Sequence, residues 1–225
     1  MKKVIVLVLM FVMAIVSTQS LQAQASIRGG INIASMSANA TEKNYKDYEN
    51  QSIFGFQFAV AMPFKISNNV AIQPELVFIQ KGGKSQYITD ENNKYISTFT
   101  SNYIEVPVSL KLGLGNTSGE GIGFYVLGGP YVGIALNGKY KNELTFLGVT
   151  STSNKTVDYT DDANTEKRID WGFNVGAGLS LGKMYLEGRY NLGINNLLDD
   201  NATNSSSSEP YRRNRGIGLT VGVHF

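Results

Sequence analysis

The sequence of 225 residues contains no cysteine, one histidine and one tryptophan, and its formal net charge is only +2. Without cysteine the fold has neither a disulfide framework nor a thiolate metal site. The single histidine, His224, cannot form a metal centre alone, and no second histidine exists to activate a nucleophile. The small net charge gives no excess of positive charge that would attract nucleic acid. We therefore expect no nucleic-acid partner, no metal, no cofactor and no catalytic residue.

Long hydrophobic runs are also scarce. The continuous apolar run from Val4 to Val16 is well short of the roughly 20 residues that a membrane-spanning helix needs. Two lysines precede this run, and Ala23-Gln24-Ala25 follows it with small residues at the cleavage positions, which is the pattern of a secretory signal peptide. The alternative is a retained N-terminal anchor. We expect residues 1–25 to be removed and residues 26–225 to form one domain.

Proline is rare, with five residues, whereas glycine is abundant, with 24. This balance favours closely spaced, curved strands over disorder. The chain ends in RGIGLTVGVHF, where apolar residues occupy every second position from Ile217 to Phe225. Such alternation predicts a strand with one apolar face. We expect eight strands of this kind, at residues 26–36, 52–64, 70–81, 101–114, 122–136, 168–181, 184–195 and 215–225.

The connections between these segments alternate in length. The short ones are residues 65–69, 115–121 and 182–183, and the long polar ones are residues 37–51, 82–100, 137–167 and 196–212. An even number of strands with this alternation is typical of bacterial outer-membrane barrels. The sequence therefore predicts an all-β fold, an eight-stranded antiparallel up-and-down transmembrane β-barrel with short periplasmic turns and long extracellular loops. A soluble lipocalin-like barrel with inverted faces stays open as a rival, because period 2 alone does not say which face is the core.

The faces opposite the apolar columns carry charges of both signs. An eight-stranded barrel has an interior just wide enough for its own side chains, so carboxylates and cations would satisfy one another there. We expect a structural cluster of lumen charges at Glu75, Lys81, Glu105, Lys111, Glu187 and Arg189, with Arg28 and Asp170 at the rims. The functional alternative is a gate or a weak ion path through the same charges.

Three stretches of the predicted loops mix tyrosine with charges of both signs: NYKDYENQS, YITDENNKYISTFTSNY and DYTDDANTEKR. Tyrosine offers contact area together with a hydrogen bond, so these loops could bind an extracellular protein partner. They are equally compatible with solvated loops and with aromatic residues at the membrane boundary.

Several stretches resemble the outer-membrane β-barrel domain of Bacteroidetes proteins often called PorT-like or porin-like. They are SIRGGINIASMS, AIQPELVFIQKGGK, YIEVPVSLKLGLG, GFYVLGGPYVGIAL, DWGFNVGAGLSLGKMYLEGRYNLGINNL and RNRGIGLTVGVHF. The resemblance implies an outer-membrane location in contact with lipid. The terminal strand, with Val221, Val223 and Phe225, likewise resembles the signal that the barrel assembly machinery recognises.

One subgroup of this family is tied to type IX secretion, although no residue here places the chain in that subgroup. We therefore expect a structural or surface-interaction protein that acts through its extracellular loops. The alternative is a narrow channel or an accessory component of a type IX-like protein secretion system.

Overall fold

The computed structural model describes residues 25–38, 48–90, 92–115, 122–157, 159, 167–198 and 211–225. The predicted signal peptide, residues 1–25, lies outside the described residues except for Ala25. None of the described residues belongs to a helix long and apolar enough to span a membrane.

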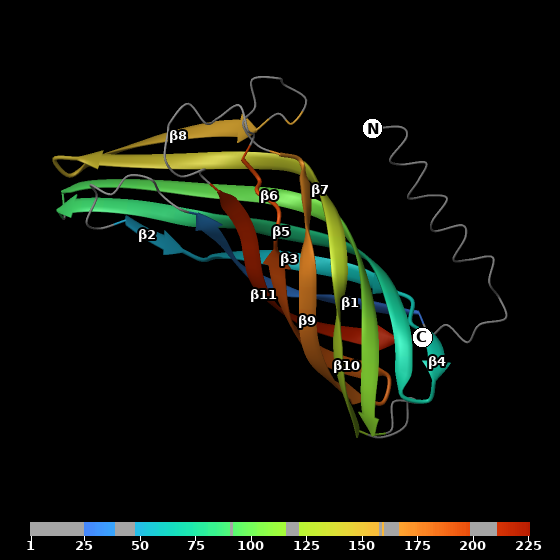
Figure 1. Ribbon diagram of the computed structural model, residues 1–225. Helices are drawn as coiled ribbons and strands as arrows, with labels where there is room; N and C mark the ends of the chain where they lie inside the picture. The colour runs from blue at the N-terminus through green and yellow to red at the C-terminus, as the bar shows by residue number, and fades with distance from the viewer. Residues whose placement is uncertain are drawn as a thin grey trace.

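Eight strands form a closed antiparallel ring (Figure 1). They are β1 (Ser26–Ala38), β3 (Ile53–Ala61), β5 (Val70–Asp90), β6 (Asn93–Gly115), β7 (Ile122–Phe146), β9 (Ile169–Leu181), β10 (Met184–Gly193) and β11 (Arg212–His224). Each strand of the ring pairs with the next one along the chain. The last strand returns to the first, with Ser26 opposite His224 and Ala38 opposite Arg212. The predicted eight-stranded up-and-down barrel is confirmed.

The alternation of side chains sets the two faces of the wall. On β3, Phe54, Phe56 and Phe58 are exposed, whereas Gly55 and Gln57 between them are buried. The same alternation holds on β6, β7, β9, β10 and β11, so that the apolar columns face outward and the polar columns face the lumen. The inverted arrangement of a soluble barrel, left open by the sequence, is wrong for this chain.

The first short connection differs from its prediction. Strand β4 (Phe64–Ser67) occupies most of residues 65–69 and pairs with β5, so that the turn itself is only Asn68-Asn69. Pro63 separates β4 from β3, because proline has no N–H to give to the ladder. The predicted turn at Gly182-Lys183 is confirmed. Of the predicted turn at 115–121, only Gly115 lies within the described residues.

Two of the predicted loops are wrong, because strands run through them. Strands β5 and β6 continue through residues 82–100, and β7 with β8 (Val149–Val157) fills most of residues 137–157. The short strand β2 (Tyr48–Gln51) adds to β5 opposite residues 84–87. The result is a five-stranded sheet in the order β2-β5-β6-β7-β8, here called the extension sheet. It continues past the ends of β9, β10, β11 and β3, as Figure 1 shows.

A bulge lies where the barrel becomes the extension sheet. The pairing of β6 with β7 shifts between Asn102 and Tyr103, so that Leu136 is the additional residue on β7. Because successive residues point to opposite faces, this one residue exchanges the two faces of β7. Below the bulge the odd-numbered residues of β7 face inward. Above it Gly138 is buried and Tyr140 lies over the mouth of the barrel.

Candidate functional site

The half of the lumen nearer the short turns holds two arginines and two glutamates in mutual contact, here called the lower cluster: Arg28, Glu75, Glu187 and Arg189. Glu75 forms ion pairs with both arginines. Arg189 Nε donates to Glu187 Oε1 at 2.7 Å, and Arg28 Nη1 lies 3.4 Å from the same oxygen. All four side chains are buried. The cluster is electrically neutral and comes from three strands, β1, β5 and β10.

The half nearer the long loops holds a second group, here called the upper cluster: Lys81, Glu105 and Asp170. Lys81 forms ion pairs with both carboxylates, at 2.9 Å to Asp170 Oδ2. Asn214 Nδ2 donates to the same oxygen at 3.0 Å. The Lys81 ammonium also lies 4.4 Å from the ring centre of Tyr131, a cation–π distance. The single cation therefore bridges β5 to β6 and β9 across the lumen.

Little space is left between the two clusters. The cavity there measures about 10 Å³ and is lined by Gln57, Pro107, Tyr131 and Asn174 among others. One water molecule needs at least about 10–15 Å³ of this kind of volume. The polar interior is therefore packed by side chains along the middle of the barrel.

The structure places the predicted lumen residues in three groups. Glu75, Glu187 and Arg189 lie in the lower cluster, and Lys81 with Glu105 lies in the upper one. Lys111 belongs to neither, and its ammonium rests 3.8 Å from the ring centre of Tyr125. Arg28 and Asp170, expected at the rims, are members of the clusters with exposed fractions of 5% and 0%.

Tyr125 and Tyr131 are inward residues that sequence reasoning missed, whereas the alternation of the fourth and seventh segments does place Tyr103 and Tyr185 inward. Tyr125 donates to Glu187 Oε2 at 2.9 Å, and its ring lies over Gly178 of the neighbouring strand. Tyr185 lies over Gly222 in the same manner. The glycines thus make room for large rings inside a narrow barrel. The sequence signal for this inward face was the odd-numbered spacing of Tyr125, Leu127 and Tyr131. The run Gly-Gly-Pro between Leu127 and Tyr131 obscures that alternation.

An aromatic and arginine group lies at the loop end of the lumen. Arg212 Nη1 donates to the Tyr140 hydroxyl at 2.7 Å, and its guanidinium carbon lies 5.2 Å from the ring centre of Phe99. The rings of Phe99 and Tyr140 are 4.7 Å apart. This group belongs to the extension sheet on one side and to β11 on the other, so it joins the sheet to the barrel rim.

The far end of the extension sheet is apolar and exposed. Leu147 and Gly148 form the two-residue turn between β7 and β8, and both have positive φ, at 50° and 79°. Their N–H groups donate to the side chain of Asn93 and to the carbonyl of Asn92 in the adjacent β5–β6 turn. The exposed fractions at this tip are 53% for Leu144, 64% for Phe146, 73% for Leu147 and 74% for Val149. Within the described ranges β8 pairs with β7 on one side only, and its residues before Val157 are exposed.

The C-terminal residues lie at the opposite end. Val221 and Phe225 are exposed on the outward face and Val223 is half-buried. The N–H of Phe225 donates to the carbonyl of Ala25 at 2.9 Å, next to the start of β1. Among the described residues, no three His, Cys, Asp or Glu side chains are placed to hold a metal ion.

Three of the solved structures similar to this chain are outer-membrane or surface proteins of other bacteria. The chain is similar to Ail, the attachment invasion locus protein of Yersinia pestis, at 16% identity over 91% of this chain and 100% of that chain, with a TM-score of 0.40. It is also similar to Neisserial surface protein A, at 11% identity over 89% of this chain and 97% of that chain, with a TM-score of 0.41. A third similar structure is the N-terminal β-barrel domain of Pseudomonas aeruginosa OprF, at 14% identity over 91% of this chain and 100% of that chain, with a TM-score of 0.31. Overlaps of this size carry no argument about function.

No curated protein matches the chain. A family model, described as the outer membrane protein beta-barrel domain, matches residues 17–199. That range is well over half of the sequence, and it includes every ring strand from β1 to β10. The chain therefore belongs to the outer membrane protein beta-barrel domain family.

Proposed function

We propose that this protein is a non-catalytic outer-membrane barrel, closed to solutes, whose extension sheet contacts a partner protein outside the cell. Residues 26–225 are the mature domain after removal of the signal peptide, and the chain is of the Bacteroidetes PorT-like kind. The C-terminal strand, with Val221, Val223 and Phe225, is the segment read by the barrel assembly machinery. The short turns then face the periplasm and the extension sheet lies outside the cell.

The closed lumen is supported by the two ion-pair clusters. Each buried charge in them has a partner of opposite sign, and about 10 Å³ of cavity remains between them. A conducting path would need these pairs to separate, which leaves charges unpaired at a cost of about 3–5 kcal/mol each. The lumen clusters therefore favour a plug over a channel.

The observation that supports the contact role is the conformation and exposure of Leu147. A leucine with φ of 50° is unfavourable by about 1–2 kcal/mol, and asparagine or glycine is the usual choice in such a turn. This leucine is 73% exposed, so no packing within the described chain repays the cost. Backbone strain that persists at an exposed position is a mark of function. With Phe146 and Val149 beside it, Leu147 forms an apolar tip suited to burial against another protein.

Site-specific photocrosslinking in intact cells tests this role. A photoreactive residue at position 147 should yield adducts with one partner protein. The same residue at Val126, in the middle of the outward barrel face, should yield none, because lipid surrounds it. The proposal fails if position 147 gives no protein adduct.

Planar-bilayer recordings of the purified barrel test the closed lumen. The expected trace is flat, without discrete conductance steps. Steps that change in size in Arg189→Ala would support the alternative, a narrow channel. Adducts with components of a protein export complex at periplasmic positions such as Lys183 would instead support a secretion accessory.

A further inference from the structure

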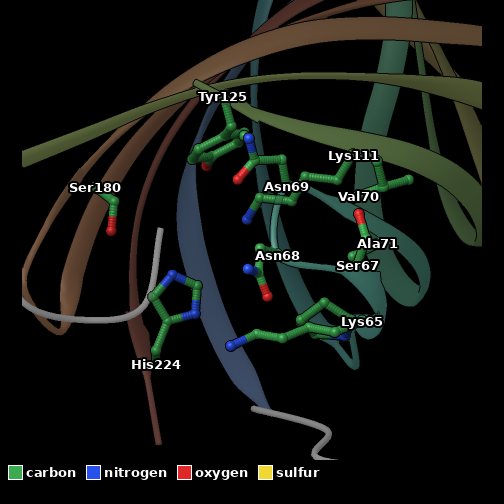
Figure 2. A pocket seen from close by; sticks show the side chains of 12 residues that line it. Lys65, Ser67, Asn68, Asn69, Val70, Ala71, Lys111, Tyr125, Ser180 and His224 are labelled. Carbon is green, nitrogen blue, oxygen red and sulfur yellow. The ribbon is translucent and has the colours of Figure 1, made fainter. Parts of the chain in front are cut away.

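A separate cavity lies at the short-turn end of the lumen, opposite to the extension sheet. Figure 2 shows this cavity from close by. The cavity has a volume of about 50 Å³ and opens to solvent. This is room for about four water molecules or for one small oxyanion. The side chains that matter here come from five segments: Lys65, Asn69, Lys111, Tyr125, Ser180 and His224.

Local backbone irregularities bring Lys65 to this cavity. Pro63 ends the ladder of β3 with β5, and the N–H of Met62 donates to the Pro74 carbonyl at 3.1 Å instead. Beyond it, β4 pairs with β5 and carries a bulge between Lys65 and Ser67. The β4–β5 hairpin therefore forms one wall of the cavity, as Figure 2 shows, and Lys65 lines it.

The lining is cationic. It contains two lysines and the only histidine of the chain, and none of the described lining residues is Asp or Glu. The nearest carboxylate of the lower cluster, Glu187, already accepts from Arg189 and from the Tyr125 hydroxyl. The positive charge of the cavity is thus not neutralised by the described residues that form it.

The surroundings of the Lys111 ammonium are the strongest indication that this cavity holds a ligand. This ammonium lies over the ring of Tyr125 at 3.8 Å, and the ring of Tyr185 is 6.0 Å away. Among the described residues, no acceptor lies within hydrogen-bond distance of Nζ and no carboxylate within ion-pair distance. An ammonium has three donors, and the cavity, which opens to solvent, leaves those of Lys111 available to an anion. Lys81, the other lumen lysine, has two carboxylates.

His224 adds a second unpartnered group. Its ring stacks on Tyr185, with 4.5 Å between the centres, and its Nδ1 is buried without a hydrogen-bond partner in the described part of the chain. Asn69 supplies a neutral donor around the same space, and Ser180, whose hydroxyl donates to the Gly182 carbonyl at 3.5 Å, lines it as well. Donors that converge from separate strands on one small cavity form a site of the kind that holds an anion.

We infer that this cavity binds a phosphate group at the periplasmic mouth of the barrel. The two lysines match the double charge of a phosphate monoester or of inorganic phosphate, and His224 completes the set of donors. The phosphate belongs either to a soluble molecule of the periplasm or to a phospholipid headgroup of the inner leaflet. This site is independent of the contact role proposed for the extension sheet.

Calorimetric titration of the folded full-length barrel with inorganic phosphate, in a maltoside detergent, tests the inference. Saturable binding at one site is expected, and Lys111→Gln and Lys65→Gln should each weaken it by roughly tenfold, the loss expected for one charge-assisted hydrogen bond. Lys65 is exposed, so its variant keeps the test valid if Lys111→Gln fails to fold. Lys183→Gln is the matched control: it removes a lysine from the same end of the barrel, outside the cavity lining, and should bind as the wild type does.

The inference is overturned if phosphate shows no saturable binding, if both lysine variants bind it as well as the control does, or if acetate binds more tightly than phosphate. Repeating the titration in phospholipid nanodiscs identifies the source. Retained binding of inorganic phosphate indicates a soluble ligand, whereas loss of binding on transfer to phospholipid indicates that a headgroup occupies the site.

Discussion

Strands β5, β6 and β7 pass through two environments, and the comparison shows which forces hold each part. In the barrel their outward residues are apolar, such as Leu110 and Val126, and their inward residues carry the buried ion pairs. In the extension sheet the same strands carry Lys84, Thr98 and Lys141 on the outward face. The β5–β6 ladder of hydrogen bonds crosses the boundary without a change of register, and the β6–β7 ladder continues on the far side of the bulge at Leu136.

This difference assigns the stability of the two parts to different sources. In the barrel, lipid is as apolar as the outward side chains, so specificity comes from the polar interior. In the extension sheet, water competes for every polar side chain, so each surface ion pair contributes little. The same kind of substitution should therefore change the stability of the barrel and of the extension sheet by unequal amounts.

The largest contrast concerns carboxylates. Glu75→Ala leaves Arg28 and Arg189 buried with one fewer carboxylate, and the expected loss is about 3–5 kcal/mol in the free energy of unfolding. Glu143→Ala removes only the partially exposed partner of Lys141, 3.0 Å away, and should cost less than about 1 kcal/mol. Urea titration followed by the fluorescence of Trp171, the only tryptophan, measures both. Equal losses would mean that the lower cluster does not hold the barrel together.

The second contrast concerns an added charge. Leu110→Arg places a guanidinium on the outward face of the part of β6 that belongs to the barrel, and the expected cost is up to about 2–4 kcal/mol, the value at the bilayer midplane. Thr152→Arg places the same group on exposed β8, where the change should stay within about 0.5 kcal/mol. Unfolding from lipid bilayers, with the same fluorescence signal, measures the two costs. A tolerated Leu110→Arg would show that this face does not meet lipid.

The third contrast lies within the barrel, between its lumen and its outer surface. A Cβ added at Gly178 meets the ring of Tyr125, which Glu187 and Lys111 hold in place, whereas one added at Gly188 meets nothing within 4 Å. Gly178→Ala should therefore destabilise the barrel by about 1–3 kcal/mol. Gly188→Ala should change the stability by less than about 0.5 kcal/mol. Thermal shifts of the heat-modifiable gel band compare the two, and equal midpoints would contradict the packing of Tyr125 described above.

The barrel and the extension sheet also differ in how well the sequence predicts them. Outward apolar columns, such as Phe54 to Phe58, are visible because lipid requires them, and the eight ring strands follow from such columns. Above the membrane nothing requires an apolar face, so the strands at residues 82–100 read as polar loops although they are rich in β-branched and aromatic residues. The position of Leu136 as a bulge is equally hidden, because it depends on the partner strand rather than on the local pattern.

The lumen residues were predictable as a group but not as contacts. Period 2 places Glu75, Glu105 and Arg189 on inward columns, but it does not give the stagger between strands that selects partners. For that reason the division into two clusters, and the isolation of Lys111 beside the cavity, needed the structure. Arg28 and Asp170 were expected at the rims because they stand near predicted strand ends, but the tilt of the strands carries both into the lumen.

The smallest contrast is between two turns of equal length. The β9–β10 turn has Gly182 at φ of 60°, whereas the β7–β8 turn has Leu147 at φ of 50°. Leu147→Asn should therefore stabilise the β7–β8 hairpin locally by about 1 kcal/mol, since asparagine tolerates this conformation. Amide hydrogen exchange of Leu144 and Val149 should slow by roughly fivefold, while the exchange of β9 and β10 should not change.

The same variant should also reduce capture of a partner, with the photoreactive residue now placed at Val149. If Leu147→Asn is more stable at the tip and yet loses the crosslink, then Leu147 serves the contact although it lowers the stability of the turn. Slower exchange with an undiminished crosslink would leave the contact to Phe146 and Val149. If exchange does not slow, the hydrogen bonds that Leu147 and Gly148 donate to Asn93 and Asn92 hold this turn tightly enough to make the residue at its first position irrelevant to its stability.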